Sequence, residues 1–196
     1  MEPIVALLPA AAVLFAGTNV DDLVVLGLLN VSRRVGGRPA AWQIWLGQYL
    51  GVALLVLASV LGAWGLRPLP RQWVWLLGLL PLGVGMYRLA AAIRARGGST
   101  AASPVLPGGL ATIVGLTVAN GGDNVAAYIP VFRTMDGPAL AVTVAVFAVG
   151  VAAWCTLGSW LVSHPRVTAL AGRWGHWIVP AVFLLLGGWL IGKTVT

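Results

Sequence analysis

The chain has 196 residues, of which 59% are hydrophobic and 9% are charged, and its net charge is +7. An ordinary soluble domain is about a quarter charged, so this composition excludes a soluble enzyme and also a disordered or fibrous chain. The basic residues stand singly or in pairs between hydrophobic runs, which indicates the positive-inside rule of membrane proteins and no nucleic-acid partner. At about 20 residues per crossing of a lipid bilayer, the chain is long enough for six helices.

Six apolar segments follow one another along the chain. The first three are expected over residues 4–29, 40–65 and 73–93, and the last three over residues 109–132, 139–163 and 174–194. A stretch rich in Gly, Ser and Ala separates the two sets and is the best linker candidate. We therefore expect three units: a three-helix repeat over residues 1–93, a cytoplasmic linker over 94–108 and a second three-helix repeat over 109–196.

A weak internal repeat supports this division. A shift of 102 residues, from 17 to 119, aligns Gly-Thr-Asn-Val-Asp-Asp at residues 17–22 with Ala-Asn-Gly-Gly-Asp-Asn at residues 119–124. Three helices in each half place the second half in the membrane in the opposite orientation. The sequence thus predicts an all-α membrane protein with six transmembrane helices in two inverted repeats, the pattern typical of secondary transporters.

The basic residues also predict the orientation in the membrane. The loops around residues 33–38, 94–96 and 166–173 carry seven arginines, whereas the other loops and the two tails carry four basic residues. Because basic loops tend to stay in the cytoplasm, we expect a multi-pass protein of a bacterial-type cell membrane with both termini outside. Tryptophans near the segment ends, such as Trp42, Trp45 and Trp64, are typical of an interfacial belt.

Three of the five acidic residues lie well inside apolar segments, namely Asp21, Asp22 and Asp123. A carboxylate in the middle of a membrane helix costs about 3 kcal/mol on insertion scales, and no basic residue of the same segments stands near enough to pair locally. One explanation for these carboxylates is that they pair with charges on other helices and so fix the packing. A site for a cation or for protons is the interpretation that we favour, with the three carboxylates close together.

Polar neighbours stand at helical spacing from these carboxylates. They are Thr18 and Asn19 in the first segment and Asn120 and Asn124 in the fourth. Carboxylate and amide oxygens are the ligands that hard divalent cations prefer. The adjacent glycines at 17, 121 and 122 favour either close helix packing or local unwinding that would free backbone carbonyl groups.

Two further polar residues are candidates for a supporting role. Gln48 lies in the motif Gly-Gln-Tyr-Leu-Gly at residues 47–51, whose glycines predict a close helix contact and whose glutamine either packs or lines the pathway. Tyr128 follows Asn124 by four residues. The single cysteine, Cys155, allows neither an internal disulfide nor a thiolate cage.

Three motifs, taken in order, resemble the cadmium-resistance transporter (CadD-like) family of the LysE superfamily. They are the motifs at residues 17–22 and 47–51, and Gly-Asp-Asn at 122–124 followed by Tyr-Ile-Pro-Val-Phe at 128–132. The resemblance covers the whole length and implies a LysE-like fold that exports Cd2+ by using an ion gradient. It implies an ion site lined by Asn19, Asp21, Asp22, Asp123 and Asn124, with Gln48 in support; the spacing adds Thr18, Asn120 and Tyr128.

The substrate has alternatives. Cd2+ is a soft ion that prefers thiolates, so Mn2+, Zn2+ or Ca2+ are alternatives for an all-oxygen site. The superfamily also includes amino-acid exporters. A remote alternative is an intramembrane aspartyl hydrolase that uses Asp22 and Asp123, but the residues before Asp123 do not form the Gly-x-Gly-Asp pattern of such enzymes.

We therefore expect a transporter and no enzyme, with no cofactor beyond the transported cation. The chain has no phosphate-binding loop of the Gly-x4-Gly-Lys-Ser/Thr type, which agrees with transport that does not use ATP. Protons can neutralise the same carboxylates as a divalent ion, so H+ is the expected coupling ion, with Na+ or K+ as alternatives. The lipid bilayer is a further partner, and a homodimer is an alternative to a monomer.

Overall fold

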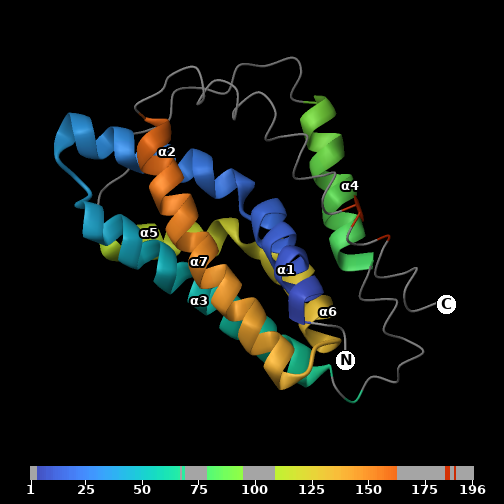
Figure 1. Cartoon of the computed structure of the whole chain (residues 1–196). Helices are drawn as coiled ribbons and strands as arrows, with labels where there is room; N and C mark the ends of the chain where they lie inside the picture. The colour runs from blue at the N-terminus through green and yellow to red at the C-terminus, as the bar shows by residue number, and fades with distance from the viewer. Residues whose placement is uncertain are drawn as a thin grey trace.

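The computed structural model describes residues 4–66, 68, 79–94, 109–162, 184–185 and 188. In this part of the chain the structure consists of helices and turns, without strands (Figure 1). The helices are α1 (Ile4–Thr18), α2 (Val20–Gly36), α3 (Ala41–Gly65), α4 (Leu79–Arg94), α5 (Leu110–Asn120), α6 (Gly122–Arg133) and α7 (Gly137–Leu161). Nearly all of the predicted linker and most of the predicted sixth segment lie outside the described residues.

Two helices, α3 and α7, are each long and apolar enough to cross a membrane. Each has 25 residues, and at 1.5 Å per residue this length exceeds the hydrocarbon core of a bilayer, which is about 30 Å thick. The pair α1 and α2 passes the same test as one bent span. For the described residues the prediction of an all-helical chain is therefore confirmed, and by length and composition they contain two to three candidate membrane spans.

The first apolar segment, predicted as one helix over residues 4–29, is broken. The axes of α1 and α2 differ by 58°, and the interruption falls at Asn19. The helix after the break, α2, also runs beyond the predicted end of the segment, to Gly36. Gly37 ends it there, because it adopts the left-handed conformation (φ 68°) and donates its N–H to the carbonyl oxygen of Arg33. The break agrees with the alternative of local unwinding near Gly17, and it falls where the side chain of Asn19 competes with the helical hydrogen-bond ladder, as described below.

The fourth apolar segment, predicted over residues 109–132, divides in the same way. α5 ends at Asn120 and α6 begins at Gly122, with Gly121 between them. Asn19 and Gly121 are 102 residues apart, which is the shift that aligns the two halves of the sequence. The two helix breaks therefore fall at equivalent positions of the repeat.

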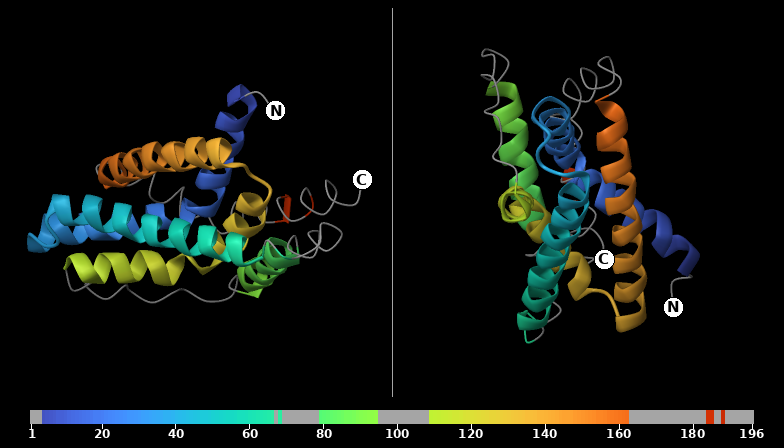
Figure 2. Two further views of the ribbon diagram at one scale, coloured as in Figure 1. Left: turned by 90° about the horizontal axis from the view of Figure 1, so that it is seen from below. Right: turned by 90° about the vertical axis from the view of Figure 1, so that its left-hand side faces the viewer.

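Each long helix packs against the broken helix of the other half (Figure 2). The most extensive contacts join α3 to α5 and α6, and α7 to α1 and α2. Glycines allow this close approach, because a Cβ atom at Gly47 or Gly51 of α3, or at Gly150 or Gly158 of α7, would lie closer than 3.0 Å to a side chain of the opposite half. The close contact predicted for the motif at residues 47–51 is confirmed.

Arginines connect the ends of the helices in a similar reciprocal way. Nη2 of Arg34, in the last turn of α2, donates to the carbonyl oxygen of Ser159 in α7 at 3.4 Å. Nε of Arg133, at the end of α6, donates to the carbonyl oxygen of Leu66, just after α3, at 3.2 Å. Both bonds satisfy carbonyl groups at helix C-termini, where a positive charge is favourable.

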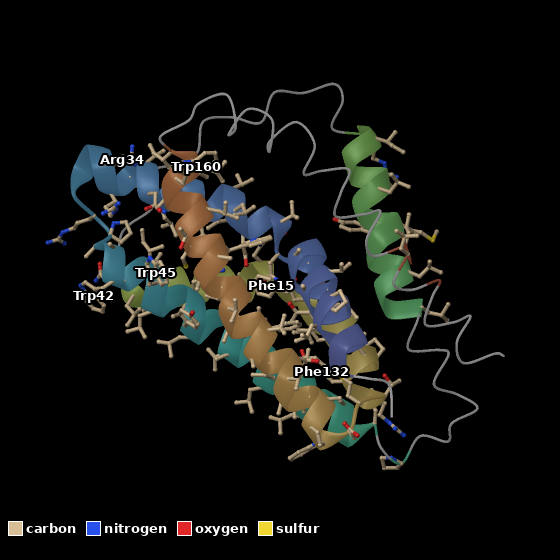
Figure 3. The ribbon with its side chains drawn as sticks, in the orientation of Figure 1. Phe15, Arg34, Trp42, Trp45, Phe132 and Trp160 are labelled. Atoms are coloured by element: carbon tan, nitrogen blue, oxygen red, sulfur yellow. The ribbon has the colours of Figure 1, made fainter. Side chains whose placement is uncertain are left out.

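Apolar side chains cover the outside of the long helices, as expected for contact with lipid. Trp42 and Trp45 lie near the start of α3, where Figure 3 shows them, and Trp64 lies near its end. Their exposed fractions are 60%, 39% and 55%. These positions agree with the predicted interfacial belt.

Candidate ion-binding site

The break between α1 and α2 is held by the side chain of Asn19, which is buried. Its Nδ2 donates to the carbonyl oxygen of Phe15 at 2.8 Å, and it lies 2.9 Å from both the Thr18 hydroxyl and the Tyr128 hydroxyl. An asparagine that bonds to nearby backbone groups offers the chain an alternative to the helix. The bend is thus stabilised by hydrogen bonds from the side chain of Asn19, the residue at which the helix is interrupted.

Asn19 also connects the two halves of the molecule. Its Oδ1 accepts a hydrogen bond from Nδ2 of Asn124 in α6 at 3.0 Å, and its main-chain oxygen accepts one from Nε1 of Trp154 in α7 at 2.6 Å. The hydroxyl groups of Thr18 and Tyr128 lie 2.9 Å apart in the same network. Three side chains of the second half therefore contact the break in the first half.

The carboxylate of Asp22 lies one turn further along, near the start of α2, and is buried. Its Oδ1 accepts from Nδ2 of Asn120 and its Oδ2 accepts from Nε2 of Gln48, both at 3.0 Å. The Thr117 hydroxyl lies 3.0 Å from Gln48 Oε1 and 3.1 Å from the carbonyl oxygen of Ile113, and donation to Gln48 favours the orientation in which the amide nitrogen of Gln48 faces Asp22. Asp22 of the first half is thus held by α3 and by the end of α5.

Asp123 and Asn124 form the corresponding part of the second half. Both are buried, and Oδ1 of Asp123 accepts from the main-chain N–H of Asn124 at 3.0 Å. Within the described part of the chain, Oδ1 of Asn124 is a buried acceptor without a hydrogen-bond partner. Such an acceptor costs about 1–3 kcal/mol, and a positive charge beside it would remove this cost.

Asp21 lies on another side of α2. It is half-buried, whereas Asp22 is buried, because consecutive residues of a helix do not face the same way. Among the residues that the structure describes, no group of three or more His, Cys, Asp or Glu side chains is arranged to hold a metal ion. The joint binding of one ion by Asp21, Asp22 and Asp123 stays a prediction, and side-chain amides from both halves lie next to Asp22 and at the first break.

The structure brings most of the predicted polar residues together where the two broken helices meet. Seven of them are buried, and Asp21 and Asn120 are half-buried. The seven are Thr18, Asn19, Asp22, Gln48, Asp123, Asn124 and Tyr128.

Two residues of this network were not predicted from the sequence. Thr117 precedes Asn120 by three residues, so helical spacing could have indicated it. Trp154 lies in the middle of an apolar segment, away from the interfaces where tryptophans usually lie in membrane proteins. Its indole N–H needs a hydrogen-bond partner there, so its position in the apolar segment could have indicated a contact with a polar group.

Comparison with known proteins agrees with the motifs. The family model described as cadmium resistance transporter matches residues 15–195, a range that includes the whole candidate site. Searches of curated proteins and of solved structures find no match to the chain. Because the family model matches nearly the full length, the chain belongs to the cadmium resistance transporter family.

Proposed function

We propose that the protein is a secondary-active exporter of divalent heavy-metal cations, with Cd2+ as its main substrate, and that it provides metal resistance. Its family is one of transporters, and its long apolar helices agree with a multi-pass membrane protein. We propose that the cation binds between the two helix breaks.

One observation carries this proposal: buried oxygen atoms lie in the first turns of α2 and α6, next to the two helix breaks. Asp22 and Asp123 bring two carboxylates into segments that are otherwise apolar, a costly placement that marks functional sites in membrane proteins. Oδ1 of Asn124 adds a buried acceptor that lacks a donor among the described residues. A cation in this position would compensate the carboxylates and the amide oxygen at once.

The proposed ligands are the carboxylate and amide oxygens of five residues. A carboxylate oxygen that accepts one hydrogen bond keeps a second lone pair, so the bonds from Gln48 and Asn120 leave Asp22 able to bind an ion. Asp21, which is half-buried, is proposed to bind at the edge of the site. The five are Asn19, Asp21, Asp22, Asp123 and Asn124, and the supporting residues are Thr18, Gln48, Asn120 and Tyr128.

An all-oxygen site is a reasonable basis for export of Cd2+. Thiolates would bind this soft ion tightly, whereas oxygen ligands bind it weakly enough for release on the far side of the membrane. The same ligands suit Mn2+ and Ca2+. We therefore propose that these ions compete with Cd2+.

The proposed architecture is six spans in two inverted three-helix repeats, over residues 1–93 and 109–196, with a cytoplasmic linker and both termini outside. Two features of the described residues support it. The helix breaks fall at equivalent positions, and each long helix packs against the broken helix of the other half. Discontinuous helices that meet around a substrate are typical of transporters built in this way.

For the coupling ion we propose H+. A divalent cation and protons neutralise the same buried carboxylates, so occupancy by one weakens binding of the other. This competition allows a cation to leave outward while protons enter the site and return inward.

The experiment is Cd2+ transport into inside-out vesicles or proteoliposomes. Asp22→Asn and Asp123→Asn each remove one buried charge, so we expect Cd2+ flux to fall by about tenfold or more while the protein still inserts. Asp136→Asn is the matched control, because Asp136 is exposed and only caps α7, through a 2.8 Å bond from the N–H of Ala139, and asparagine caps a helix equally well. Normal flux in the Asp22 and Asp123 variants, or loss of flux in the Asp136 variant, would contradict the proposed site.

A further inference from the structure

Trp154 makes a contact that the proposed function does not use. Its indole N–H donates to the main-chain oxygen of Asn19 at 2.6 Å, across the boundary between the two halves of the chain. The ring is held in place by Phe15, against which it packs edge-on at a centroid distance of 5.4 Å. Phe15 itself lies where α1 passes α7 (Figure 3). The donor is therefore fixed in position at the break.

The acceptor of this bond is an unusual carbonyl group. Asn19 interrupts the helix, and its carbonyl oxygen lies beside the hydrogen-bond network that contains Asn124, one helical turn before Asp22. Main-chain carbonyls at interrupted membrane helices are common ligands of cations in transporters. A tryptophan N–H has no lone pair and carries a partial positive charge at hydrogen, so it opposes a cation at that oxygen.

We infer that Trp154 is a positioning residue that withholds the main-chain carbonyl of Asn19 from the transported cation. When the hydrogen bond opens, the carbonyl oxygen joins the ligands and the cation binds more tightly. When α7 again packs on the break, the indole takes the carbonyl back and the cation is released. This inference rests on the proposed function, because it assumes that a cation binds between the breaks.

The test is Trp154→Phe in the full-length protein, with Cd2+ and Mn2+ as the probes. The variant keeps an aromatic ring next to Phe15 but removes the donor. We expect Kd for the cation to fall roughly three- to tenfold, the equivalent of one net hydrogen bond, and kcat for transport to fall because release is slower. Trp160→Phe is the matched control, because Trp160 lies on the same helix and is exposed. It should change neither constant.

A role in packing alone would give a different result, with weaker or unchanged cation binding in Trp154→Phe, and that outcome would overturn the inference. A second measurement, on the wild-type protein, tests the inference if Trp154→Phe does not accumulate in cells. In NMR spectra of wild-type protein with 15N-labelled indole groups, the Trp154 signal should shift on titration with Cd2+. This signal is assigned by its absence from the spectrum of Trp154→Phe or Trp154→Tyr, whichever variant folds. An unchanged signal in a protein that binds Cd2+ overturns only the role of Trp154, whereas a wild-type protein that binds neither cation overturns the proposed function.

Discussion

Asn19 and Gly121 interrupt equivalent helices in the two halves of the chain, but the two interruptions are held by different forces. Hydrogen bonds hold the first, since side chains of α6 and α7 bond to both the side chain and the carbonyl group of Asn19. Packing holds the second, because the side chain of Leu55 in α3 occupies the space where a Cβ atom of Gly121 would lie. The polar groups near Gly121 come from its neighbours, Asn120 and Asn124.

This difference assigns different roles to the two breaks. The two hydrogen bonds that Asn19 accepts, at Oδ1 and at its main-chain oxygen, can be exchanged for bonds to a cation, so the geometry of this break can respond to the ion. A steric contact with a glycine cannot be exchanged in this way. We therefore regard the Gly121 break as the fixed support and the Asn19 break as the part of the site that senses occupancy.

The strongest test of the packed break is Gly121→Val. A valine needs the space that the end of the Leu55 side chain occupies. Such overpacking lowers the free energy of unfolding by about 1–3 kcal/mol, and we expect a loss at the upper end of this range because valine is branched at Cβ. The measurement is thermal or denaturant unfolding in detergent. Leu55→Ala in the same chain should restore part of the loss.

The neighbouring glycine is the control. A Cβ atom at Gly122 would meet no atom within 4 Å, and alanine is favoured over glycine inside a helix by up to about 1 kcal/mol. Gly122→Ala should therefore be neutral or stabilising. A Gly121 variant as stable as wild type would show that packing does not hold this break.

A somewhat smaller effect is expected at the hydrogen-bonded break. Asn19→Ala leaves the Tyr128 hydroxyl and the Asn124 amide without one partner each. Hydrogen bonds between membrane helices contribute about 0.6 kcal/mol on average and up to 1.7, so we expect a loss of about 1–2 kcal/mol in the same unfolding assay. Cation binding should weaken as well, because a ligand oxygen is removed.

Asn30→Ala is the matched control for this variant. Asn30 is likewise a buried asparagine and lies within α2, but its amide donates inside that helix, to the carbonyl oxygen of Leu26 at 2.8 Å. We expect it to lower stability slightly and to leave cation binding unchanged. Equal effects of the two substitutions on cation affinity would remove the special role of the Asn19 break.

The smallest effect is expected at Thr117, just before the packed break. Thr117→Val preserves the shape but removes the donor that orients the Gln48 amide. Gln48 can then turn its oxygen toward the cation site, so we expect unchanged folding and a severalfold change in Kd for Cd2+. Thr143→Val is the control, since Thr143 is likewise buried, but its hydroxyl donates to the carbonyl oxygen of Ala139 and lies 3.6 Å from the Met135 sulfur, and neither residue belongs to the network. Identical binding curves for the two variants would show that Gln48 does not depend on Thr117.

The sequence predicted the burial of the polar residues better than their arrangement. Asp22, Asn19 and Gln48 stand in strongly apolar segments, and an expensive polar group in such a segment has to be turned inward. The ends of α3 and α7 agree with the predicted segments within two residues, because long apolar runs have clear limits. These features depend on local composition, which the sequence contains directly.

The helix breaks and the partners of each side chain were not predictable in this way. Gly17 and Gly121 suggested unwinding near the right places, but the first break falls at Asn19, where hydrogen bonds from the other half stabilise it. The share of amide groups in the site depends on how α5 and α3 meet α2, which is a tertiary contact. Spacing along one helix cannot reveal a partner that lies about 100 residues away.

The central claim is that a cation binds to oxygen atoms between the two breaks, and cadmium NMR of the purified protein tests it most directly. The chemical shift of bound cadmium separates oxygen ligands from sulfur ligands. We predict one bound signal in the oxygen range that Asp22→Asn abolishes and Asp136→Asn leaves unchanged. A signal in the thiolate range that survives Asp22→Asn and is lost in Cys155→Ala would contradict the account.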